Sequence, residues 1–140
     1  MGVRGLSCEV ALPLVAADAE VRRCLAAEGF GVLTVIDLAA TLRERLGVER
    51  APLLILGACH PALAHRALTI DSAASLLLPC NVVLEGLGPE RTRVTAVDPL
   101  SLLTLPELEP VAAEASARLG RVLAAVAERL PVLLAPPVTA

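Results

Sequence analysis

Aromatic side chains are almost absent from this chain of 140 residues, and lysine does not occur at all. It contains no tryptophan, no tyrosine and a single phenylalanine, and all twelve of its basic residues are arginine. Proteins that bind single-stranded nucleic acid stack the bases on aromatic side chains, and proteins that bind duplexes present a basic surface. Because the formal net charge is −3, we expect no nucleic-acid partner.

Long apolar runs are also missing, although apolar residues make up 56% of the chain. Proline, glycine or charge interrupts each run before the roughly 20 residues that span a bilayer. Near the N-terminus, Leu6, Cys8, Val10 and Leu12 alternate with small or polar residues, which favours a strand over a cleaved signal peptide. We therefore expect no membrane partner, a cytoplasmic location and reduced cysteines.

Familiar catalytic motifs do not occur either. The C-x-x-C pattern is absent, and residues 29–31 join a helix to a strand, the reverse of the order in a nucleotide-binding loop. Ser72 and Ser75 lack a nucleophile elbow. Asp37 and Asp98 end strands, where a carboxylate can act as a general base, but helix capping and turn formation account for both. The motifs therefore indicate no particular reaction.

The apolar periodicities predict an α+β fold with a mostly antiparallel sheet of about five strands. The last two strands should form a hairpin, and a long amphipathic helix near the C-terminus should pack on one face of the sheet. We expect strands at residues 5–12, 31–36, 52–57, 76–85 and 91–97, and helices at 16–28, 38–46, 61–68 and about 110–130.

The whole chain, residues 1–140, is expected to form one domain, because its length suffices for a real core and no linker or repeat divides it. The core should cover about residues 5–130. The proline-rich apolar tail at 131–140 is too rich in proline for a central strand. We expect it to pack on its own domain or on a second subunit.

Two apolar runs, residues 53–61 and 76–83, each place a cysteine beside a proline. Cys59 precedes a helix that should begin near Pro61, and the free N–H groups of a helix start lower the pKa of a thiol. Pro79 should make its strand an edge or a bulged strand, which would turn Cys80 toward Cys59. The alternative is that both cysteines are ordinary core residues.

The histidines lie in the same part of the chain. Cys59, His60, His65 and Cys80 would be suitable soft ligands for zinc or copper, and a haem-like ligand is a further alternative. Their spacing matches no familiar zinc pattern. A capping or surface histidine is therefore the competing interpretation for His60 and His65.

Three stretches together resemble the bacterial and archaeal family named only domain of unknown function 302. They are residues 28–37, residues 56–61 with 64–68, and residues 76–83. Cys59, His65, Cys80 and Asn81 match the family's pattern, whereas His60 stands where the family usually has asparagine. The resemblance extends over about residues 5–130. It implies a fold similar to the TATA-binding-protein type, in the order strand-helix-four strands-helix with small inserted helices, and it implies homodimers. It implies no activity.

Three functions remain open. The leading hypothesis is a binding or sensing module whose pocket has Cys59, His65, Cys80 and Asn81 as polar points, with a small molecule, a metal or a haem-like cofactor as ligand. The second is a structural protein that forms homodimers and keeps its cysteines in the core. The third is a thiol enzyme with Cys59 as nucleophile and His65 as base.

Overall fold

The computed structural model describes residues 2–128. At its centre lies a five-stranded sheet in the order β1-β5-β4-β3-β2, in which each neighbouring pair is antiparallel. The strands are β1 (Gly5–Val10), β2 (Gly31–Asp37), β3 (Leu53–Cys59), β4 (Cys80–Gly88) and β5 (Arg91–Val97). β4 is therefore the central strand, and β1 and β2 form the two edges.

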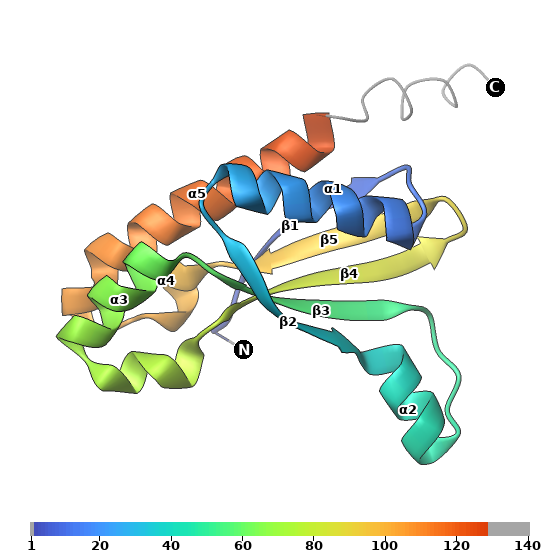
Figure 1. Cartoon of the computed structure of the whole chain (residues 1–140), viewed down its shortest axis with the longest axis horizontal. Helices are drawn as coiled ribbons and strands as arrows, with labels where there is room; N and C mark the ends of the chain where they lie inside the picture. The colour runs from blue at the N-terminus through green and yellow to red at the C-terminus, as the bar shows by residue number, and fades with distance from the viewer. Residues whose placement is uncertain (1, 129–140) are drawn as a thin grey trace.

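Two long helices cover one face of this sheet (Figure 1). They are α1 (Leu14–Ala27) and α5 (Glu109–Glu128), which pack against each other and against the strands. The inserted elements are α2 (Leu38–Leu46), α3 (Pro61–Ile70), α4 (Pro99–Leu102) and two short 3₁₀ helices, η1 (Ser72–Leu77) and η2 (Pro106–Leu108). The expected α+β class, with its strand-helix-four strands-helix order, is confirmed.

Side chains alternate across the sheet because successive residues of a strand point to opposite faces. On β4, Val82 and Leu84 are fully buried in the core that includes residues of α1 and α5. Asn81, Val83 and Glu85 point to the opposite side, which we call the open face, and are more accessible. The alternation thus places the core between the sheet and the two long helices.

The apolar side chains form two clusters. The larger one lies between the sheet, α1 and the C-terminal half of α5. The smaller one joins α3, η1, the segment after α4 and the N-terminal half of α5. Its members are Leu63, Ala67, Ala74, Leu103, Leu108, Val111, Ala112 and Ala115. Both halves of α5 are therefore needed, each for a different cluster.

The fourth strand begins later than the apolar pattern predicts. Residues 72–77 form η1, whose start is capped by Asp71 through its Oδ1, which accepts from the Ala73 N–H at 2.9 Å. Pro79 precedes the strand and has no N–H to donate to a ladder, so β4 starts at Cys80. Both expected consequences of Pro79 are wrong. The strand that follows it, β4, is central and not an edge, and the register shifts lie between Val32 and Thr34 on β2 and near the end of β4.

Among residues 2–128, no helix combines the length and the apolar character needed to cross a membrane. The predicted end of the last helix at about residue 130 and the tail at 131–140 lie outside the described residues.

Candidate functional site

Cys59 and Cys80 lie at the same end of two neighbouring strands. Cys59 is the last residue of β3, and its chain neighbour Ala58 is the cross-strand partner of Cys80, the first residue of β4. The two thiols are close enough that the ionisation of Cys59 would raise the pKa of Cys80. Ordinary antiparallel pairing, not a bulge, brings them together.

Both cysteines line a small cavity of about 30 Å³ between the sheet and α3. Its other walls are apolar and include Phe30, Leu63 and Leu103. A cavity of this size has room for one or two water molecules at most. It is far below the 300–1,000 Å³ or so that a typical small-molecule ligand occupies.

Burial raises the pKa of the Cys59 thiol, and burial together with the neighbouring Cys59 raises the pKa of Cys80 to about 11. The lowered pKa expected for Cys59 beside a helix start is therefore wrong. The reason is that burial disfavours the charged thiolate. The N-cap position of α3 is held by His60, whose Nδ1 accepts from the Leu63 N–H at 3.3 Å. Both thiols are protonated at neutral pH, and a protonated thiol is a weak nucleophile and a weak metal ligand.

His60 is held by contacts on two sides. Its ring meets that of Phe30 edge to face, with the ring centroids 5.5 Å apart, and its Nε2 lies on the side of Gly29, where an added Cβ would be only 2.8 Å away. The Nδ1 atom of His60 thus forms the cap of α3. This is the geometry of a capping histidine, the interpretation that competed with a metal ligand.

His65 is exposed on α3, away from the cysteines. It borders a different hollow of about 480 Å³, together with Arg66, Glu107 and Pro110. Within residues 2–128, no three His, Cys, Asp or Glu side chains are grouped so that they could hold a metal ion. A soft-metal site would have only Cys59 and Cys80, fewer than the four ligands of a structural zinc site.

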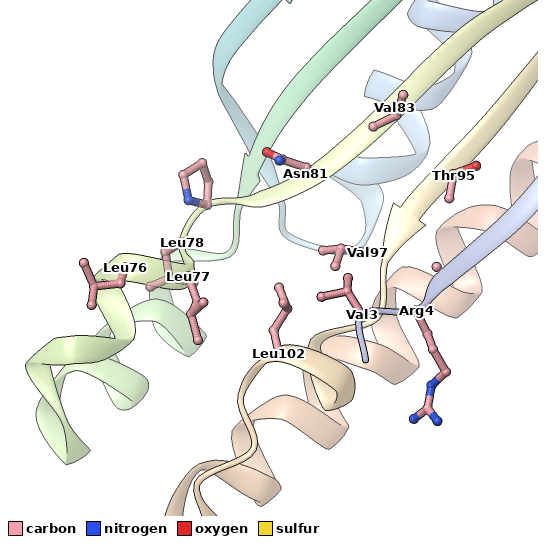
Figure 2. Close-up of a pocket in the computed structure, with 12 residues that line it drawn as sticks. Val3, Arg4, Leu76, Leu77, Leu78, Asn81, Val83, Thr95, Val97 and Leu102 are labelled. Carbon is pink, nitrogen blue, oxygen red and sulfur yellow. The ribbon is translucent and has the colours of Figure 1, made fainter. Parts of the chain in front are cut away.

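A larger hollow of about 530 Å³ lies on the open face of the sheet (Figure 2). Leu77 of η1 and Leu102 of α4 stand on opposite walls, and Asn81, Val83 and Thr95 lie on the strands of its floor. Further aliphatic side chains line it, among them Val3, Leu78, Pro79 and Val97. The hollow thus has the size of a small-molecule site and a mainly aliphatic lining.

Asn81 supplies the free polar group of this hollow. It is exposed, and its carboxamide makes no hydrogen bond to any side chain or backbone group of residues 2–128. Thr95, in contrast, shares a hydrogen bond with Ser7 at 3.1 Å between the two hydroxyl oxygens, and the guanidinium group of Arg4 extends away from the hollow in Figure 2. The chain has one asparagine and no glutamine, so Asn81 carries its only carboxamide side chain.

The structure therefore divides the four residues named from the sequence. Cys59 and Cys80 come together, Asn81 lies beside them in sequence but faces the larger hollow, and His65 lies elsewhere. Sequence reasoning missed the walls contributed by Leu102 and Val3, and it assigned Leu77 to a strand rather than to η1. No local signal marks them, because each comes from a different segment and only the tertiary fold assembles them.

An antiparallel sheet with one helix-covered face and one open, hollowed face defines the protein as a small α+β domain. Residues 6–126 match the family model described as "Domain of unknown function DUF302". The chain belongs to this family, as the resemblance of its sequence motifs indicated.

A solved structure supports the same assignment. The uncharacterised conserved DUF302 protein from Bacillus stearothermophilus is 25% identical to this chain and superposes with a TM-score of 0.79. The match covers 87% of this chain and 97% of the other. No curated protein matches the sequence.

Proposed function

We propose that this protein binds a small molecule in the open-face hollow. The ligand would have an aliphatic body and a carboxamide or carboxylic acid head group. The observation that carries the proposal is the unengaged carboxamide of Asn81 inside an otherwise aliphatic hollow of about 530 Å³. Typical ligand sites combine such an apolar lining with a few polar groups that orient the ligand.

The aliphatic lining determines the body of the ligand. Leu76 and Leu77 are 84% and 39% exposed, so apolar area on this wall remains available for burial. Burying apolar surface is favourable by about 25 cal/mol per Å². An unbranched or branched alkyl chain would contact these side chains along the length of the hollow.

Asn81 determines the head group. A carboxamide side chain offers two N–H donors and one carbonyl acceptor, and covering it without partners would cost roughly 1–3 kcal/mol. A ligand must therefore donate and accept hydrogen bonds at the same point. A primary amide or a protonated carboxylic acid does both in one planar group.

Binding is best followed on Asn81 itself. Because the chain has no other carboxamide side chain, the side-chain NH₂ signals of Asn81 form an isolated pair in a heteronuclear NMR spectrum. We expect decanamide to shift this pair in a saturable manner. Asn81→Asp keeps the shape but removes the donors, and it should weaken binding about tenfold, as loss of one or two hydrogen bonds does.

Two results would overturn the proposal. One is an NH₂ pair that stays in place while decanamide shifts backbone signals elsewhere, and the other is the absence of saturable binding by decanamide and decanoic acid alike. Val15→Ala is the matched control, since Val15 is 81% exposed on α1 and lies on the helix-covered side of the sheet. This variant should bind decanamide like the parent.

The geometry supports the thiol enzyme less well, because burial raises the pKa of Cys59 and His65 lies in a different hollow. We also propose a cytoplasmic location, where reducing conditions would keep the four free cysteines as thiols.

A further inference from the structure

β2 is an edge strand that exposes large apolar side chains. Leu33, Val35 and Ile36 are 65%, 51% and 46% exposed, and the strand pairs on one side only, with β3. An edge strand presents a row of unpaired backbone N–H and C=O groups, which makes it a template for another strand. Hydrophobic side chains on such an edge strengthen that tendency.

The usual protections of an edge are few on β2. From Gly31 to Ile36 the strand contains no charged residue and no proline, the two residue types that most often prevent edge pairing. A bulge between Val32 and Thr34 interrupts the ladder once. From Thr34 to Asp37 the strand pairs in regular register with β3, so its outer edge is regular there as well.

The segment that follows β2 adds to this surface. Helix α2 stands at the far end of β2 and β3, apart from α1 and α5 (Figure 1). Among its residues only Ala39 is buried, while Leu46 is 69% exposed and Val48, just after the helix, is 46% exposed. We call β2 together with α2 and Val48 the β2 arm.

We infer that the β2 arm is the interface with a second copy of this chain, and that the two β2 strands pair antiparallel across a two-fold axis. A two-fold interface joins the same surface patch of both subunits, so the patch must complement itself. An uncharged strand with apolar side chains meets this condition, because backbone pairs with backbone and apolar side chains meet apolar side chains.

The alternation of side chains restricts the register of the two β2 strands. An antiparallel pair related by a two-fold axis keeps both helix-covered faces on the same side, so residues opposite each other must point to the same face. Val35 pairs with Leu56, which is buried in the core, whereas Thr34 and Ile36 pair with Gly57 and Ile55 on the open-face positions. Several registers meet this condition, each centred on one residue of β2. We infer the one centred on Val35, because it pairs the regular, uncharged stretch from Thr34 to Ile36 with itself. Val35 is then opposite the partner's Val35, and Thr34 is opposite the partner's Ile36.

Apolar side chains supply part of the area that a dimer needs. The five exposed apolar side chains of the β2 arm are 46% to 69% exposed, and they lie on both faces of β2 and along α2 to Val48. A standard interface buries about 800 Å² per partner. The paired backbones and the polar side chains of α2 would supply the remainder.

Sedimentation equilibrium of the full chain tests this inference. We expect twice the mass of the chain at micromolar concentrations. Val35→Lys and Ile36→Lys, each made separately, place like charges near the two-fold axis, and each should raise the dimer Kd by about a hundredfold or more. Val15→Lys introduces the same charge at an exposed apolar site of α1 and should leave the Kd unchanged.

Val35→Cys provides an independent test that does not depend on weakening the dimer. On mild oxidation it should form a disulfide-linked dimer, whereas the parent and Val15→Cys should not. A monomeric parent, or a dimer that survives both lysine variants, would overturn the inference. A dimer that dissociates on Leu76→Lys but not on Val35→Lys would overturn it too, because the interface would then lie at the open-face hollow.

Discussion

A Cβ atom added to Gly29 would lie 2.8 Å from Nε2 of His60. Gly29 also has a positive φ of 86°, a conformation in which other residues are strained. Gly29→Ala should therefore lower the free energy of unfolding through both effects, by about 2–4 kcal/mol. Urea unfolding of the variant measures the loss.

Gly47→Ala separates the two contributions. Gly47 has a φ of 66°, but nothing lies within 4 Å of its added Cβ, so this variant should show only the backbone cost of about 1–2 kcal/mol. If Gly29→Ala and Gly47→Ala lose the same free energy of unfolding, the contact with His60 adds no cost, and the His60 ring moves aside freely.

His60 caps α3 through Nδ1, and asparagine is among the best N-cap residues. His60→Asn should therefore retain the capping hydrogen bond, whereas His60→Ala should lose about 1 kcal/mol for the cap and up to about 1 kcal/mol more for the contact with Phe30. Thermal unfolding of both variants checks this order. Asp37→Ala, which removes only the cap of α2, is the reference for a cap alone, and a His60→Asn variant as unstable as His60→Ala would disprove the capping role.

The stability of the protein should fall between about pH 9 and pH 11. The folded state raises the pKa of Cys80 from 9.0 to about 11, so the folded state holds the thiol proton over this range while the unfolded state releases it. The contribution is complete below pH 9 and lost as the pH rises through 11, and it amounts to about 2–3 kcal/mol. Because the chain has no lysine or tyrosine, cysteines are the side chains that titrate there.

Urea unfolding at a series of pH values measures this loss. Cys80→Ser should remove the largest part of the decline, and a smaller part should remain because burial also raises the pKa of Cys8 and Cys59. An unchanged decline in Cys80→Ser would assign it to the other thiols.

Alkylation near neutral pH should be slow at both cysteines of the pair. The thiolate is the reacting form, and burial holds the pKa of Cys59 and Cys80 above the ordinary value. Iodoacetamide labelling followed by mass spectrometry should give Cys59 a rate below that of a free thiol and Cys80 a lower rate still. If iodoacetamide labels Cys59 faster than it labels glutathione, the result would favour the hypothesis of a thiol enzyme.

Gly57 is required where β2 bulges against β3. A Cβ on Gly57 would overlap Oγ1 of Thr34 and lie 2.8 Å from Cγ of Pro79. Gly57→Ala should cost about 1–3 kcal/mol in the free energy of unfolding, as overpacking does. Thr34→Ala removes the overlap with Oγ1, so the double variant Gly57→Ala/Thr34→Ala should recover part of the lost stability. If the effects of the two substitutions simply add in the double-mutant cycle, the contact between the new Cβ and Thr34 does not exist.

Local patterns predicted most of the fold. The alternation in residues 6–12 gave β1, the amphipathic stripe beginning near Val111 gave α5, and Asp37 capped α2 as expected. The fourth strand was misplaced because an apolar run such as Leu76–Leu78 fits a strand and a 3₁₀ turn equally well. The capping carboxylate of Asp71 and the missing N–H of Pro79 decide between them.

The candidate site could be predicted less well. The proximity of Cys59 and Cys80 depends on the register between β3 and β4, and two strands alone do not reveal it. The pKa of Cys59 depends on how deeply its thiol is buried. Its position before a helix, which is all that the sequence gives, does not reveal that burial. Asn81 was identified, but its separation from Cys80 follows from the alternation of faces along β4.

The separate cluster formed by α3, η1 and the N-terminal half of α5 has a consequence for local unfolding. A segment with its own small core can open without disrupting the sheet. Amide hydrogens of α3 and η1 should therefore exchange with deuterium faster than those of β4 and β5. Since η1 supplies one wall of the open-face hollow, an occupant of that hollow would slow this exchange.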